Sequence, residues 1–85
     1  MLYKEITVKT LEGIKSRTAA KLVKVAEQFD SQILIEVENK KINAKSIMGV
    51  LSLNIHQGES IYVLANGKDE KEAIESIEST LSEEE

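Results

Sequence analysis

Hydrophobic and polar residues follow two different periods along the chain, and these periods divide it into strands and helices. In some segments apolar residues alternate with polar ones, which is the pattern of strands that bury one face. In others they recur every three or four residues, as in amphipathic helices. The predicted strands lie around residues 2–8, 33–37, 42 and 60–65, and the predicted helices cover residues 16–29, 46–53 and 69–81.

The first and last helices have well-defined apolar faces. In residues 16–29 this face consists of Ala19, Leu22, Val23, Ala26 and Phe29. The opposite face carries Arg17, Lys21, Lys24 and Gln28. In the last helix the apolar stripe consists of Ala73, Ile74, Ile77 and Leu81. Asp69, followed three residues later by Glu72, predicts that this helix begins with a capping box.

The order of these elements predicts the fold class. The order is β-α-β-β-α-β-α, and no linker or internal repeat interrupts it. A right-handed crossover makes the first two strands parallel and leaves room for the fourth strand between them. We therefore expect a single α+β domain over residues 1–85, an open-faced sandwich with a four-stranded, mainly antiparallel sheet and all three helices on one face.

Composition excludes several classes of protein. The chain has 85 residues and no cysteine, so neither a disulfide scaffold nor a cysteine-based zinc site can form. Its N-terminus alternates apolar and charged residues, unlike a signal peptide. No window approaches the ~18 apolar residues of a membrane span. These features predict a cytoplasmic protein without membrane contact, and we expect no metal or cofactor.

One basic region stands out on an acidic chain whose formal net charge is −4. Every charge between positions 13 and 26 is positive: Lys15, Arg17, Lys21 and Lys24. A local basic patch of this kind indicates an anionic partner rather than general nucleic-acid binding. RNA-binding sheets also stack bases on aromatic side chains, and this chain has only three aromatic residues. We therefore expect no direct contact with nucleic acid.

Most other candidate sites lack support in the sequence. His56 is the only histidine, and no serine, cysteine or aspartate stands at a spacing that would make it a general base. We interpret it as a surface residue. The glycines at positions 13, 49, 58 and 67 fit neither a dinucleotide-binding pattern nor a phosphate-binding P-loop.

Two places remain where the sequence favours an anion. Ser16 is a predicted N-cap for the first helix, and the helix N-terminus together with Lys15 and Arg17 forms a generic anion site. The alternative interpretation is a solvated basic face. Ser46 follows Lys45 and opens a short apolar turn. It is either a plain N-cap or a phosphorylatable serine, because a phosphate there would meet a favourable helix dipole.

The segment 43-NAKSIMGVLSL-53 resembles the regulatory-serine signature of the HPr family of the bacterial sugar phosphotransferase system. The order of elements, the Gly13-Ile14 entry to the first helix and the terminal helix agree with this family, so the resemblance covers essentially the whole chain. It implies an open-faced HPr-like fold and a role as a phosphocarrier or a regulator.

The chain departs from the family at the site of phosphoryl transfer. HPr proteins carry a phosphorylatable histidine in a Gly-Ile-His-Ala-Arg-Pro-Ala context, whereas residues 13–19 here read GIKSRTA. Lys15 therefore occupies the histidine position and Thr18 the proline position. A lysine amine has an ordinary pKa of about 10.4 and is almost wholly protonated at pH 7. We expect phosphocarrier activity to be lost.

The pattern is most like the Crh branch, which lacks the active histidine and keeps the regulatory serine. That branch has glutamine and proline where this chain has Lys15 and Thr18, so a separately diverged HPr paralogue is the alternative. The resemblance implies that HPr kinase/phosphorylase phosphorylates Ser46. It also implies that the phosphoprotein is a corepressor for a LacI-type catabolite control protein.

These observations lead to a main hypothesis and two alternatives. In the main hypothesis, phosphorylated Ser46 and its neighbours dock on a partner. The residues expected at this surface are Lys15, Ser16, Arg17, Lys21, Lys24, Lys45, Ile47, Met48 and Leu51. Of the apolar ones we expect Leu51 to be buried and Met48 to be exposed. The alternatives are a phosphocarrier with another acceptor, such as Ser16, and an adaptor that has kept only the fold.

Overall fold

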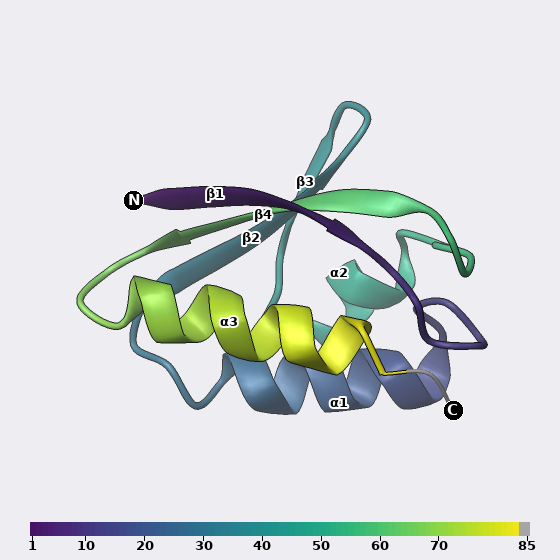
Figure 1. The fold of residues 1–85 in the computed structure, drawn as a ribbon, viewed down its shortest axis with the longest axis horizontal. Helices are drawn as coiled ribbons and strands as arrows, with labels where there is room; N and C mark the ends of the chain where they lie inside the picture. The colour runs from purple at the N-terminus through teal and green to yellow at the C-terminus, as the bar shows by residue number, and fades with distance from the viewer. Residues whose placement is uncertain (84–85) are drawn as a thin grey trace.

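A computed structural model describes residues 1–83 and contains the predicted elements in the predicted order (Figure 1). The strands are β1 (Leu2–Thr7), β2 (Gln32–Val37), β3 (Lys40–Asn43) and β4 (Ser60–Asn66). The helices are α1 (Ser16–Ala26), α2 (Ile47–Leu51) and α3 (Glu70–Leu81). The sequence prediction of the order β-α-β-β-α-β-α is confirmed.

The four strands form one sheet in the order β1-β4-β2-β3. Each neighbouring pair is antiparallel, so β1 and β2 run parallel to each other on either side of β4. In Figure 1, α1 and α3 lie side by side beneath this sheet, and α2 sits between the sheet and one end of α1. The predicted α+β open-faced sandwich with all helices on one face is confirmed.

The alternation of side chains along the strands explains why only one face is covered. Along β2 and β4 every second residue points toward the helices and, apart from the half-buried Val37, is fully buried. The residues between them point to the open face. The large buried side chains are Ile6, Val8, Ile14, Leu22, Ile33, Ile35, Val50, Ile61, Val63, Ile77 and Leu81. On the open face, the rings of Tyr3 and Tyr62 stack with their centroids 5.2 Å apart.

The first helix ends three residues earlier than the apolar pattern predicts. Beyond Ala26 the backbone N–H groups of Gln28 and Phe29 donate to carbonyls three residues back, at 3.1 and 3.2 Å. This tighter winding closes the helix and leads the chain into the turn before β2.

The predicted capping box of the last helix is wrong. Asp69 is the N-cap residue of α3, but its carboxylate makes no cap hydrogen bond. Instead it accepts hydrogen bonds from the Ser31 hydroxyl and from the N–H groups of Asp30 and Ser31, which tie the α1–β2 loop to α3. The Ser31 hydroxyl first, and then these N–H groups, lower the pKa of Asp69 below its ordinary value. The carboxylate therefore serves a long-range contact rather than its own helix.

Candidate functional site

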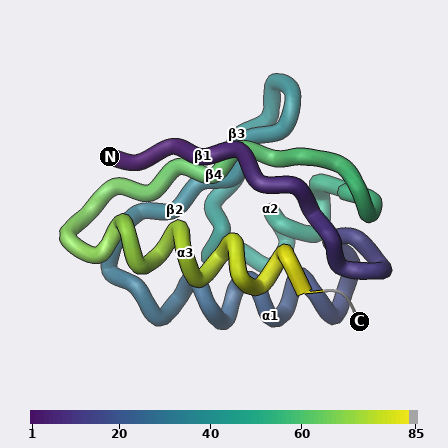
Figure 2. Tube along the Cα trace, viewed as in Figure 1, coloured from purple at the N-terminus to yellow at the C-terminus, as the bar shows by residue number. Residues whose placement is uncertain are grey.

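The N-terminus of α1 and the short helix α2 lie at the same end of the molecule. The tube in Figure 2 follows the chain from β1 through the loop before α1, and α2 lies beside that region. Helix α2 contacts both α1 and β3. The fold thus packs α2, which begins after Ser46, against α1, whose entry carries Lys15. The α2–β4 loop, through Ile55, is the segment that contacts the entry to α1.

A glycine turn positions the entry to α1. Gly13 has a φ of 71°, in the left-handed region that favours glycine, and a β-carbon there would lie 2.1 Å from the Ile55 carbonyl oxygen. The next residue, Ile14, donates its N–H to that same oxygen at 2.9 Å. The Thr10 hydroxyl donates to the Gly13 carbonyl at 2.6 Å. These contacts pin the loop to the α2–β4 connection and place Lys15 on the surface.

The N-cap of α1 is Lys15, and the prediction of Ser16 is wrong. Lys15 has an extended backbone, with φ −119°, and its carbonyl accepts the first helical hydrogen bond, from Ala19 at 2.7 Å. Ser16 is already the first helical residue, so its hydroxyl is not placed to cap the N–H groups that follow. The pairing of Ile14 with Ile55 keeps the chain extended up to Lys15 and shifts the start of the helix by one residue.

A carboxylate that the sequence analysis missed caps this helix. Glu12 Oε2 accepts a hydrogen bond from the Thr18 backbone N–H at 2.9 Å. This bond is the main cause that lowers the pKa of Glu12, followed by the Thr18 hydroxyl and the Arg17 charge, while partial burial opposes them. The sequence signal that could have predicted this cap is an acidic residue directly before the glycine turn that leads into the helix, because negative charge is favourable near a helix N-terminus.

Ser46 is the N-cap of α2, as predicted. Its backbone is extended, and its hydroxyl oxygen accepts a hydrogen bond from the Gly49 N–H at 3.2 Å. The preceding turn is held by the Asn43 side chain, which accepts from the Lys45 N–H at 2.8 Å. Ser46 itself is half-buried, with its hydroxyl at the start of the helix.

The predicted burial of Leu51 is wrong. Ile47 and Leu51 are each 41% exposed and Met48 is 76% exposed, whereas Val50 is fully buried. Since α2 has only five residues, a single apolar position faces the core, and Val50 occupies it. We call the exposed set, Ile47, Met48 and Leu51, the α2 patch. The expected exposure of Met48 is confirmed.

The basic residues divide into exposed and internally bonded groups. Lys15, Arg17 and Lys24 have exposed side chains on α1 or at its entry. Lys21 is also exposed but forms an ion pair with Glu83 at 2.9 Å. The Lys45 ammonium donates to the Phe29 carbonyl at 2.7 Å, so it ties the α2 entry to the end of the α1 region.

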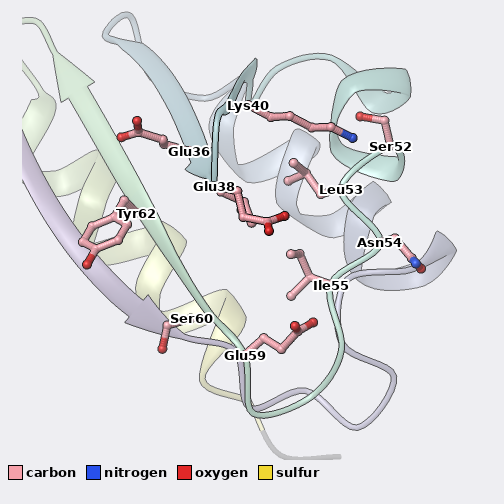
Figure 3. A pocket seen from close by; sticks show the side chains of 11 residues that line it. Glu36, Glu38, Lys40, Ser52, Leu53, Asn54, Ile55, Glu59, Ser60 and Tyr62 are labelled. Carbon is pink, nitrogen blue, oxygen red and sulfur yellow. The ribbon is translucent and has the colours of Figure 1, made fainter.

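A separate hollow of about 780 Å³ lies between the β2–β3 turn and the α2–β4 loop. Figure 3 shows the carboxylates of Glu38 and Glu59 directed toward it, from opposite sides. The Glu59 carboxylate also accepts a hydrogen bond from the His56 backbone N–H and lies 3.2 Å from Nδ1 of the His56 ring.

Within residues 1–83, no three acidic or histidine side chains converge to hold a metal ion. None of the described helices is both long and apolar enough to cross a membrane.

Comparison with known proteins identifies the family to which this arrangement corresponds. Residues 2–83 match the family model described as "PTS HPr component phosphorylation site". The chain belongs to the HPr family. HPr and HPr-like proteins are phosphocarriers or regulators rather than enzymes, and we assign no enzymatic activity to this member.

The similar proteins include HPr-like and phosphocarrier members of the HPr family. The chain is 46% identical over 77 residues to the HPr-like protein Crh of Halalkalibacterium halodurans, covering 91% of this chain and 92% of that protein. It is 38% identical over 84 residues to the HPr-like protein Crh of Bacillus subtilis, covering 99% of each. A crystal structure of the phosphocarrier protein HPr from Bacillus anthracis superposes with a TM-score of 0.91 at 38% identity, covering 94% of this chain and 95% of that one.

Proposed function

We propose that this chain is an HPr-like regulator of carbon catabolite repression that is switched by phosphorylation of Ser46. HPr kinase/phosphorylase is the proposed modifying enzyme, and a LacI-type catabolite control protein is the proposed partner, both in the cytoplasm. The observation that carries the proposal is the placement of Ser46 at the N-cap of α2, directly beside the exposed α2 patch. The HPr-like relatives named Crh support the same role.

The geometry at Ser46 suits a phosphate. Its hydroxyl oxygen already faces the Gly49 N–H, and a phosphoryl group would bring three strong acceptors and a charge of about −1.5 to −2 to that helix end. The helix dipole would stabilise this charge by at least about 0.3–1 kcal/mol, the range for exposed positions, since Ser46 is half-buried. We therefore expect the fold to change little and the surface presented to the partner to change strongly.

The α2 patch is the proposed apolar half of the recognition surface. Its three side chains are exposed and mutually adjacent on one short helix, and methionine adapts readily to different partners. Lys15 and Arg17 on the neighbouring helix entry are the proposed cations that bridge the phosphoserine and the partner, or bind carboxylates of the partner. Lys24 extends this basic surface along α1.

Loss of phosphocarrier activity is the second part of the proposal. A phosphohistidine carrier needs a nucleophilic nitrogen lone pair, and a protonated lysine at the same position lacks one. The entry to α1 also differs from the HPr pattern, because Thr18 stands at the proline position and has a backbone N–H group, which donates a hydrogen bond to Glu12. Ser16 is exposed, and among the described residues its hydroxyl forms no hydrogen bond to a carboxylate or histidine that could activate it.

The phosphoryl donor distinguishes the regulator from a carrier. The protein is incubated with labelled ATP and HPr kinase/phosphorylase, and separately with labelled phosphoenolpyruvate and enzyme I. We expect label from ATP alone, and its loss in Ser46→Ala. Ser52→Ala is the matched control, because Ser52 caps the other end of the same helix and donates to the Gly49 carbonyl. Label from phosphoenolpyruvate would favour the carrier, and no label from either donor would favour an adaptor.

Binding to the partner tests the rest of the proposal. The affinities of phosphorylated and unphosphorylated protein for the LacI-type regulator are measured by calorimetry, at one ionic strength. We expect the phosphorylated form to bind at least tenfold more tightly, and Arg17→Ala to reduce that advantage. Equal affinities of the two forms would exclude the corepressor role.

A further inference from the structure

The open face of the sheet has an apolar centre that none of the described helices covers, because all of them lie on the other face (Figure 1). Tyr3, Leu64 and Leu34 stand directly opposite one another across β1, β4 and β2. Beside this row, the exposed ring of Tyr62 stacks on that of Tyr3 with an angle of 15° between the ring planes. The solvent-facing side of an antiparallel sheet is ordinarily polar, so this apolar centre indicates a contact surface.

Carboxylates flank the stacked rings. Glu5 on β1 and Glu36 on β2 stand on either side of Tyr62 in one cross-strand row. The Tyr3 hydroxyl donates to Glu36 Oε1 at 3.0 Å, which holds this carboxylate beside the rings and leaves Oε2 without a partner among the described residues. Partial desolvation raises the pKa of Tyr3, and the hydrogen bond and charge of Glu36 and the charge of Glu5 raise it further. Lys41 stands opposite Glu36 on β3, but no ion pair joins these two described residues.

The acidic character continues into the hollow beside the β2–β3 turn. Glu36 and Tyr62 belong both to the open face and to the lining of this hollow, and the carboxylates of Glu38 and Glu59 point into it (Figure 3). Lys40 is the one basic residue in that lining. Because carboxylates outnumber cations over the open face and the hollow together, this surface attracts basic groups and repels the phosphates of a nucleic acid.

We propose that the open face binds an arginine-bearing segment of a partner protein, with the guanidinium against the Tyr3–Tyr62 pair and bonded to Glu36. A guanidinium is planar, so it can stack on a tyrosine ring and also donate two parallel hydrogen bonds to a carboxylate, which a lysine ammonium cannot do. The apolar row accommodates the aliphatic stem of the arginine.

The proposed segment has a second basic residue that extends toward the hollow. Side chains two positions apart in an extended segment point the same way, so both basic residues would face the sheet. The open face lies on the opposite side of the sheet from the α2 patch (Figure 1). The inference is therefore independent of phosphorylation at Ser46.

The probe is a blocked peptide, acetyl-Gly-Arg-Gly-Arg-Gly-amide, which is titrated into the protein at one ionic strength. Peptides with lysine, or with the neutral analogue citrulline, in place of arginine are the references. The backbone amides of β1 and β4 are the reporters in two-dimensional ¹⁵N–¹H NMR spectra, which also report whether each variant is folded. The variants are Glu36→Gln and Tyr62→Thr, which removes the ring but keeps a strand-favouring residue. The matched control is Glu75→Gln, at an exposed carboxylate on α3.

We expect the arginine peptide to give a saturable shift of the Tyr3 and Tyr62 amides, with an apparent Kd about threefold lower than that of the lysine peptide. The citrulline peptide should give no saturable shift. Tyr62→Thr and Glu36→Gln should each raise the Kd about threefold, and Glu75→Gln should leave it unchanged.

Equal binding of the arginine and lysine peptides, equal losses in all three variants, or no saturable shift with the arginine peptide would overturn the proposal. A concentration-dependent dimer of the protein alone, measured by sedimentation and abolished in Tyr62→Thr, would also overturn it. In that case a second copy of the chain, rather than a different partner, would occupy the open face.

Discussion

Two truncations in α2, at Met48 and Val50 on either side of Gly49, separate the contribution of this helix to stability from its contribution to recognition. Val50 is fully buried against the core, and Met48 is 76% exposed in the α2 patch. Replacing Val50 by alanine removes two buried carbon atoms and leaves a small cavity, a loss of about 2 kcal/mol. Replacing Met48 by alanine removes side-chain atoms that are mostly in water, so the loss should be below about 0.5 kcal/mol.

Thermal unfolding followed by circular dichroism measures this difference directly. For a domain of this size each kcal/mol shifts Tm by about 4–8 °C. Val50→Ala should therefore lower Tm by roughly 8–16 °C, and Met48→Ala by less than about 4 °C. In the binding assay the order should reverse: Met48→Ala should weaken binding of the phosphorylated protein to its regulator about tenfold, or 1.4 kcal/mol.

Two results would refute this reasoning. An equal, large fall in Tm for both variants would place Met48 in the core and remove the α2 patch as a free surface. Unchanged affinity of Met48→Ala would remove the side chain from the recognition surface even if the stability results agree. Leu51→Ala, from a residue that is 41% exposed, should give an intermediate fall in Tm.

Three further predictions concern the entry to α1 and the α3 cap. Lys15→His alone should not restore phosphorylation by phosphoenolpyruvate, because Glu12 still occupies the helix N-terminus; transfer at the rate of an HPr phosphocarrier would contradict this. Gly13→Ala should lower the free energy of unfolding in urea by at least about 3 kcal/mol, because its β-carbon would lie 2.1 Å from a backbone oxygen in a left-handed turn. A decrease below about 1 kcal/mol would be evidence against this clash. Asp69 has a lowered pKa in the fold, so its stabilising effect is complete above the unfolded pKa of about 3.9 and disappears as pH falls through the lower folded pKa. The urea midpoint should therefore fall more steeply below pH 4 in the wild type than in Asp69→Asn; parallel curves would show that this carboxylate does not contribute.

Local patterns were sufficient for the elements and for one of the two site positions. The strict alternation around Ile33 and Ile35 predicted a strand because side chains of a strand point to opposite faces regardless of what covers them. Ser46 was predicted as an N-cap because its hydroxyl bonds an N–H only three residues away. The order of the strands followed from the handedness of the crossover, which depends on general backbone geometry.

The remaining features depend on contacts between residues that are distant in sequence. A five-residue helix is too short for its period to show which side faces the core, so the burial of Val50 rather than Leu51 was decided by the packing of α2 on α1 and β3. Glu12 reaches Thr18 only because the bond from Ile14 to the Ile55 carbonyl, across 41 positions, folds the loop back over the helix start. The sequence by itself determined the strands, the helices and the N-cap role of Ser46, because each depends on residues that are close neighbours along the chain. The tertiary structure alone decided which carboxylate occupies the N-terminus of α1, because that depends on where a distant loop holds the chain.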